Sequence, residues 1–242
     1  MKYKLSLPLV LFSVAVMASA ANAQKLMAQE IIAKHLDSIA TAEKRANFRS
    51  LVVSGEVRVE YITQKNQPAI GRAVFASEGN KMFLGMNLNT ANYPHERIIF
   101  DGDKSSVALI VGGSRSVLGN FIQSSDVVLS HGLLSGTLGT SWVFLNGGET
   151  KAKISTAGTK KIGGREAYGL LYSPKGGSDL EIRMYFDQET FRHVRTEYGR
   201  TASARMGATI DQSARELETR LKVIEDFSEF KEFDGVTLPS KY

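Results

Sequence analysis

Apolar residues recur at helical spacing near the start of the chain and at two-residue spacing through most of the rest. Between Gln24 and Asn47 the apolar positions are three and four residues apart, which predicts one amphipathic helix. At about 1.5 Å per residue this helix would be roughly 35 Å long, so its apolar face needs a large partner surface, and we expect a sheet. From Leu51 to Tyr61 apolar and polar residues alternate, which predicts a half-buried antiparallel strand.

Turn residues divide the following alternating segments into hairpins. The turns hold Gly, Asn and Asp, as in Glu78-Gly79-Asn80 and Asp101-Gly102-Asp103-Lys104. The strands expected after Tyr61 are Ile70–Ala76, Lys81–Leu88, Glu96–Phe100, Ser106–Val111, Trp142–Leu145, Lys151–Lys161, Arg165–Tyr172, Leu180–Phe186, His193–Tyr198, Leu221–Phe233 and Val236–Tyr242. Together with the helix, many short strands at this spacing predict an α+β protein built mostly of antiparallel β-structure, as a sheet, sandwich or barrel.

One segment interrupts the alternating pattern. Gly112 to Thr140 is rich in Gly and Ser, and the spacing of its apolar residues predicts short helices rather than strands. Ser124-Ser125-Asp126 provides a capping sequence for one of them. Two interpretations remain open: the segment is a lid over a cavity, or it is a helical connection that packs on the core for structural reasons.

Residues 1–23 have the pattern of a cleavable signal peptide. Two lysines precede the apolar stretch Leu5–Met17, which at about 13 residues is shorter than the roughly 20 that a membrane-spanning helix needs. Ala21-Asn22-Ala23 then satisfies the small-x-small cleavage rule. We therefore expect an exported, periplasmic protein in which residues 24–242 form a single domain.

Composition narrows the classes of function. The chain has no cysteine, which rules out disulfides and zinc sites built on thiolates. The net charge is +5, and basic residues are interleaved with acidic ones rather than clustered. We therefore expect no nucleic-acid binding and at most transient contact with a membrane surface.

The chain contains no recognisable catalytic constellation. We expect His35 on a solvated helix face, His193 on the exposed side of a strand and His95 in a loop. His131 follows Ser130 inside the helical segment, but adjacency in sequence is not the geometry of a catalytic triad. A hydrolase would need His131 or a buried acid to meet a serine inside a pocket. We expect no enzyme activity and no cofactor.

The remaining indication of function is the large number of big apolar residues on the expected strands and in the helical segment. An ordinary core explains them, and so does a concave strand face that forms an apolar pocket for an acyl chain. The candidate cavity residues are Val57, Val59, Tyr61, Phe83, Phe100, Leu109, Phe121, Leu129, Trp142, Phe144, Leu170, Tyr172, Met184 and Phe186.

The order of elements and three segments resemble the Lol-type periplasmic lipoprotein carriers. Residues 71–110 are similar to the second to fifth strands of that family, and Leu180–Tyr198 to a later hairpin. Phe227–Pro239 is similar to a segment of outer-membrane lipoprotein-sorting proteins. The resemblance implies an incomplete, open β-barrel, with a long N-terminal helix and a helical lid packed on its concave face.

The resemblance also implies a function and partners. Its members hold the acyl chains of a lipoprotein in a hydrophobic cavity, so the expected partners are lipoprotein or lipid acyl chains and membrane proteins that handle lipoproteins. The family's latch arginine is missing, because the turn after the second strand holds Glu78 and Gly79. The chain also ends at Tyr242 as a strand begins, where relatives continue for further strands. The alternative is a non-catalytic envelope interaction or sensor module on the same fold.

Overall fold

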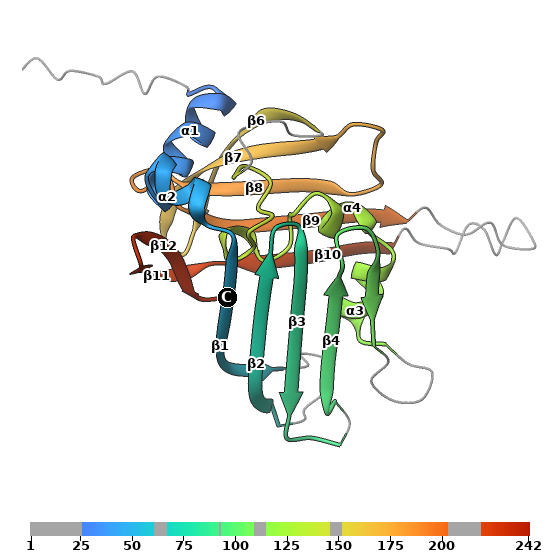
Figure 1. Cartoon of the computed structure of the whole chain (residues 1–242). Helices are drawn as coiled ribbons and strands as arrows, with labels where there is room; N and C mark the ends of the chain where they lie inside the picture. The colour runs from blue at the N-terminus through green and yellow to red at the C-terminus, as the bar shows by residue number, and fades with distance from the viewer. Residues whose placement is uncertain (1–25, 61–66, 92, 109–114, 146–151, 203–218) are drawn as a thin grey trace, which may run out of the picture.

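The structure, a computed structural model, describes residues 26–60, 67–91, 93–108, 115–145, 152–202 and 219–242 (Figure 1). The predicted signal peptide lies outside these residues. The helices are α1 (Ala28–Ile39), α2 (Ala42–Asn47), α3 (Val117–Gln123), α4 (Asp126–Ser130) and the 3₁₀ turn η1 (Gly136–Leu138). The strands are β1 (Ser50–Val59), β2 (Ala69–Glu78), β3 (Lys81–Leu88), β4 (His95–Phe100), β5 (Ser105–Val107), β6 (Ala152–Ile162), β7 (Arg165–Pro174), β8 (Glu181–Asp187), β9 (His193–Ala202), β10 (Thr219–Asp226), β11 (Ser228–Phe233) and β12 (Val236–Lys241).

The N-terminal helical region is two helices rather than the single long helix expected from the sequence. Ala40 is extended at the end of α1, and the Thr41 side chain accepts a hydrogen bond from the Lys44 amide to start α2. Thr is a preferred N-cap residue, and this local hydrogen bond satisfies a backbone amide that a new helix leaves free. The break shortens the face that packs on the sheets, which α1 provides through Ile31, His35 and Ile39.

Two separate five-stranded antiparallel sheets make up most of the described molecule (Figure 1). The first sheet has the order β1-β2-β3-β4-β5 and the second has the order β10-β9-β8-β7-β6. The prediction of an α+β protein with mostly antiparallel strands is therefore confirmed. In the described residues the two sheets share no strand pairing and do not close into a barrel.

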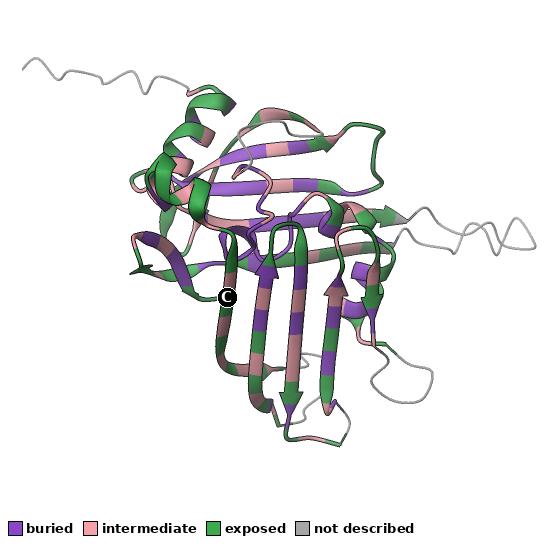
Figure 2. Ribbon diagram, viewed as in Figure 1, coloured by how far each residue is buried: buried purple, intermediate pink, exposed green. Residues whose placement is uncertain are grey.

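The inner faces of the two sheets contribute to one apolar core. In the first sheet Phe75, Leu84 and Ile98 are register partners in neighbouring strands, and all three are buried. In the second sheet Leu170 pairs with Met184, and both are fully buried. Figure 2 shows the resulting alternation of buried and more exposed positions along the strands. The two-residue period read from the sequence is thus a period of burial.

The third sheet arises from a break in an expected strand. The sequence predicts one strand over Leu221–Phe233, but the chain bends at the buried Phe227 and forms two strands. β10 stays in the second sheet, whereas β11 pairs with β12 alone among the described strands. The Phe227 amide still donates to the Val194 carbonyl at 3.0 Å, so the chain leaves the second sheet only after this residue.

Residues 115–145, called the insertion below, connect the two sheets. They contain α3, α4 and η1, which confirms the prediction of short helices. The predicted strand Trp142–Leu145 is wrong, because these residues form turns. Local bonds replace a strand ladder: Trp142 N donates to Gly139 O, and Leu145 N donates to Trp142 O. Among the described residues no helix is long and apolar enough to cross a membrane.

Candidate functional site

Most of the predicted cavity residues meet in the core between the two sheets and the insertion. Each member of this group is at most 6% exposed, and all belong to one apolar cluster. The group contains Phe100, Phe121, Leu129, Trp142, Phe144, Leu170, Tyr172, Met184 and Phe186. These residues come from six separate segments that the fold brings together, namely β4, α3, α4, residues 142–144, β7 and β8.

The other predicted cavity residues lie elsewhere. Val57 and Val59 pack in a small cluster with Leu88 near the far end of the first sheet. Phe83 faces the opposite side of that sheet, because its neighbours in β3, Met82 and Leu84, are buried on the inner face. Tyr61 and Leu109 lie outside the described residues.

Side chains of the insertion fill the space between the inner faces of the sheets. Besides Trp142 and Phe144, seven of its large apolar residues are at most 5% exposed. They are Phe121, Ile122, Val128, Leu129, Leu133, Leu134 and Leu138. The insertion is thus packed on the core in this structure, as the connecting-helix interpretation requires, and the lid interpretation stays a prediction.

The C-terminal half of the insertion, residues 132–145, is fastened by buried polar contacts. The Trp142 indole N–H donates to Nε2 of His35 at 3.0 Å. The Ser135 amide donates to the Glu225 carboxylate at 2.7 Å. Thr140 donates from its amide to the hydroxyl of Ser77 at 3.1 Å. These contacts tie the half to α1, β10 and β2.

His35 and His193 are buried, so the predictions that they face solvent are wrong. His35 is 0% exposed and His193 is 1% exposed. His35 lies four residues from both Ile31 and Ile39, so the apolar stripe of the helix contained the signal that places it inside. His193 stacks on Trp142, with ring centroids 4.6 Å apart.

Burial and hydrogen bonding define the tautomer and the charge of the His35 ring. Because Nε2 accepts from Trp142, Nδ1 carries the proton and donates to the Phe191 carbonyl at 3.0 Å. Burial lowers the pKa of His35 to about 4, so the ring is neutral at pH 7. Burial also lowers the pKa of His193 well below its usual value.

Glu225 is a buried carboxyl group that sequence reasoning did not single out. It accepts hydrogen bonds from the hydroxyls of Tyr198 at 2.6 Å and Tyr242 at 2.7 Å, besides the Ser135 amide. Burial raises its pKa. The three donors join β9, the insertion and the end of the described chain at one point, which is a structural role.

The N-terminal half of the insertion, α3 and α4, is fastened differently. Arg200 of β9 donates to the Ser124 carbonyl at 3.0 Å and to the Ser125 hydroxyl at 2.9 Å. The guanidinium also pairs with Asp179, 2.7 Å away. The Arg200 side chain is 18% exposed, so this fastening lies close to solvent.

A surface pocket of about 290 Å³ lies where this half meets the β4–β5 hairpin. Phe100 and Leu129 lie at the pocket, and both belong to the apolar core. Its rim is polar and includes Lys104, Gln123 and Asp126. The pocket therefore connects a polar surface with core residues at the edge of α4.

His131, the histidine singled out by sequence, contacts a tyrosine. Its Nδ1 lies 2.7 Å from the Tyr172 hydroxyl. Burial raises the pKa of Tyr172 to about 12, so the hydroxyl stays protonated at neutral pH. The described residues contain no group of three His, Asp or Glu side chains that could hold a metal ion.

Comparisons with known proteins find likeness only among solved structures. The sequence matches no protein-family model and no curated protein. A LolA superfamily protein from Nitrosomonas europaea has 12% identity and a TM-score of 0.42, over 89% of this chain and 84% of that one. A DUF1329 family protein from Desulfovibrio piger has 10% identity and a TM-score of 0.42, over 87% and 82%. Similarity at this level assigns the chain to no family.

Proposed function

We propose that this protein is a non-enzymatic, periplasmic binder or carrier of acyl chains from a lipid or lipoprotein. The acyl chain takes the place of α3 and α4 between the inner faces of the two sheets. The observation that carries the proposal is the insertion itself, whose apolar side chains cover the concave side of two open sheets. The signal-peptide pattern of residues 1–23 supports a location in the periplasm.

The apolar free energies of burial are similar for α3 and α4 and for an acyl chain that would replace them. A buried Leu, Ile, Val or Phe side chain contributes about 1.5–3 kcal/mol. An acyl chain of about 15 methylenes gains about 12 kcal/mol on burial, at roughly 0.8 kcal/mol for each methylene. Phe121, Ile122, Val128 and Leu129 are therefore comparable in apolar free energy to the chain that would displace them.

The two halves of the insertion have different parts in this exchange. Residues 132–145 stay in place because His35, Glu225 and Ser77 hold them through buried hydrogen bonds. α3 and α4 move, because Arg200 holds them near solvent and the contact of His131 with Tyr172 lies only at the end of α4. The pocket beside Leu129 is the entrance, because its lining joins the core residues Phe100 and Leu129 to a polar rim at the edge of α4.

A reversible disulfide tests whether α3 must move. A Cβ added at Gly119 would lie 2.8 Å from Cγ1 of Val107, so the Val107→Cys/Gly119→Cys pair is close enough to form a disulfide between α3 and β5. The chain has no other cysteine to interfere. Val52→Cys/Ala76→Cys, at register partners within the first sheet, is the matched control.

The readout is uptake of a fluorescent palmitate analogue by the mature chain, residues 24–242. We expect the oxidised Val107/Gly119 pair to block uptake and reduction to restore it, while the control pair binds in both states. Undiminished uptake by the oxidised pair would contradict the proposal. Native mass spectrometry of the protein purified from the periplasm, with organic extraction, identifies any acylated ligand that is bound.

A second candidate is a non-catalytic protein-interaction module, which one surface feature favours. Val52 is 72% exposed on the outer face of the first sheet. Its register neighbours across that face are Ala76, Phe83 and Ile99, in three consecutive strands. Such an apolar row on an outer face is typical of a partner surface.

Crosslinking in the periplasm distinguishes this candidate. A photoreactive residue at Val52 would capture one defined partner, and a photoreactive residue at Lys153, exposed on the edge strand β6, would not. Equal capture from both positions would reject the interaction module.

A further inference from the structure

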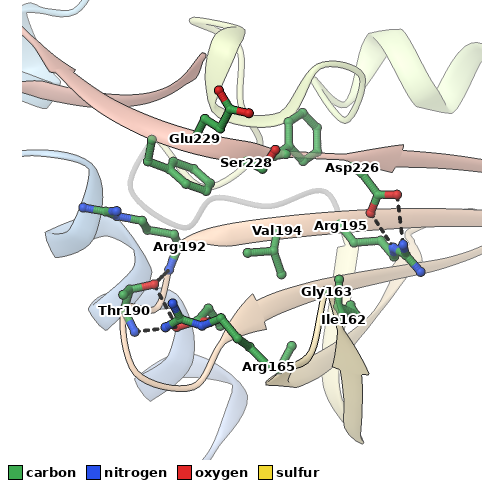
Figure 3. Close-up of a pocket in the computed structure, with 14 residues that line it drawn as sticks. Ile162, Gly163, Arg165, Thr190, Arg192, Val194, Arg195, Asp226, Ser228 and Glu229 are labelled. Atoms are coloured by element: carbon green, nitrogen blue, oxygen red, sulfur yellow. Dashed lines mark hydrogen bonds and ion pairs between the residues drawn. The ribbon is translucent and has the colours of Figure 1, made fainter. Parts of the chain in front are cut away.

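A second concavity, called the outer pocket below, lies on the outer face of the second sheet (Figure 3). In β9 the side chains of Thr196 and Tyr198 point into the core, so Arg195 points to the opposite face. Arg195 lines the outer pocket, which has a volume of about 370 Å³. This volume is at the lower end of the range for ligand pockets. The outer pocket is therefore separate from the space between the sheets.

The path of the chain after β10 creates the outer pocket. The last pair between β9 and β10 is Arg195 with Asp226. Beyond Phe227 the chain leaves the sheet, and β11 pairs with β12 instead. Glu229 adopts a φ of +53° in this wall, a conformation that few residues other than glycine adopt. The space beside the start of β9 is left open as a result.

The acidic residues of the outer pocket are already paired. Asp187 bonds to Arg165 at 2.7 Å, and Asp226 bonds to both sides of the Arg195 guanidinium. Glu229 lies 3.8 Å from the Lys241 ammonium. The ion pairs that involve Arg165 and Arg195 are drawn in Figure 3.

Arg192 is the exception among the cations of the outer pocket. Its guanidinium lies over the Phe230 ring, 5.3 Å from the centroid, and no described carboxylate lies within ion-pair distance of it. The turn before it is fixed, because the Asp187 carboxylate accepts from the amide and the hydroxyl of Thr190. Burial acts to raise the pKa of Asp187, but hydrogen bonds from Thr190 and Arg165 lower it, so the carboxylate stays charged.

We infer that the outer pocket is a docking site for an acidic peptide segment of a partner protein. A carboxylate of the peptide pairs with Arg192, and a neighbouring apolar side chain rests on Val194 and Phe230. An arginine held over an aromatic ring is well placed to form a forked pair with a carboxylate.

The charges of the lining favour a carboxylate over a phosphate group. One cation is free, and Asp187 and Asp226 stand nearby with their own partners. A dianion would meet a single guanidinium and would be repelled by both carboxylates. The apolar part of the lining, which includes Ile162, Ala167 and Phe230, calls for a ligand with a hydrophobic group beside its charge.

The test starts with random peptides displayed on phage and selected on the mature chain. We expect the enriched peptides to share an Asp or Glu next to an aliphatic or aromatic residue. One enriched peptide is then labelled for fluorescence anisotropy, together with its Asp→Asn or Glu→Gln form. For the wild-type protein we expect the charged form to bind about tenfold or more tightly than the neutral form.

Two variants assign that difference to Arg192. Arg192→Gln should bind both forms of the peptide equally weakly, whereas Arg72→Gln, on the exposed outer face of the first sheet, should behave as wild type. Trp142 fluorescence confirms that each variant is folded, since Trp142 is the only tryptophan of the chain. Uptake of the palmitate analogue should be unchanged in Arg192→Gln, which separates this inference from the acyl-chain proposal.

Three results would overturn the inference. The first is that the selection enriches no peptide at all, or enriches peptides that lack an acidic residue. The second is that the wild-type protein binds the charged and neutral forms of the peptide equally tightly. The third is that the charged form still binds more tightly than the neutral form in Arg192→Gln. Phenylacetate, a small carboxylate with an apolar ring, is the competitor. If phenylacetate binds as tightly as the selected peptide, the outer pocket is a small-molecule site and not a docking site.

Discussion

The two halves of the insertion pack against the same core but are held there by different forces. Residues 132–145 combine apolar packing with buried hydrogen bonds from Trp142, Ser135 and Thr140. α3 and α4 combine apolar packing with Arg200, which lies near solvent, and with the hydrogen bond between His131 and Tyr172 at the end of α4. Buried polar contacts have specific geometry, whereas apolar packing can be replaced by any apolar group of suitable shape. The difference suggests one permanent half and one exchangeable half.

The largest expected effect comes from removing the Trp142 side chain. Trp142 is fully buried and stacks on His193, so Trp142→Ala should lower the free energy of unfolding by about 3–5 kcal/mol. Urea denaturation followed by circular dichroism measures the loss. In the other half, Val117→Ala removes a side chain that is 71% exposed and should change the free energy by less than about 0.5 kcal/mol. Similar losses in both variants would contradict the buried anchor.

Acid should weaken the permanent half through His35. The unfolded chain takes up a proton at His35 near pH 6.5, and the folded protein does so only near pH 4. The free energy of unfolding should therefore fall by about 3 kcal/mol as the pH drops from 6.5 to 4, and this contribution should not change further below pH 4. Protonation of Nε2 would also remove the acceptor for Trp142.

His35→Gln isolates this effect from other titrating groups. The Gln amide does not titrate, so the variant should lose about 3 kcal/mol less than wild type over the same pH interval. Urea denaturation at pH 6.5 and pH 4 of both proteins gives the difference. Parallel loss of stability in the two proteins would show that other groups, such as His193, account for the acid sensitivity.

Removing the Arg200 side chain should act on the exchangeable half alone. Arg200→Ala should cost about 1–2 kcal/mol, because the hydrogen bonds to Ser124 and Ser125 are charge-assisted but close to solvent. Hydrogen exchange should become faster in α3 and α4 and stay unchanged in residues 135–145. Arg58→Ala, which removes an exposed ion pair with Glu60, is the control and should leave exchange unaltered. Faster exchange in both halves would show that the insertion opens as one unit.

The smallest expected effect concerns the start of α3. The Ser116 side chain accepts from the Gly119 amide at 2.7 Å, so Ser116→Ala should cost about 1 kcal/mol. Ser125 precedes α4 without a capping hydrogen bond of this kind, so any cost of Ser125→Ala should reflect its contact with Arg200. Double variants that combine each serine change with Arg200→Ala distinguish the loss of a helix cap from the loss of the contact with Arg200. Additive costs are expected for Ser116→Ala, and non-additive costs for Ser125→Ala.

The sequence by itself determined most of the local elements of this protein, with the exception of the breaks after α1 and β10 and of the turns at 142–145. Alternation of apolar and polar residues located β1, β2 and β3, and the turn residues between β2 and β3 located their hairpin. The short helices of the insertion also followed from spacing and from Gly and Ser content. These features depend on residues within a few positions of one another, so a single sequence contains them.

Tertiary structure alone decided which groups were buried and what they met. Phe83 and Leu84 are both apolar neighbours in β3, and only the partner layer determines which of them faces the core. His35 lies on the apolar stripe of its helix, but only the fold brings Trp142, 107 positions away, to donate a hydrogen bond to its ring. Arg192 lies over the ring of Phe230, because the chain passes into β11 after Phe227. Such contacts join segments that are distant along the chain, so no local pattern records them.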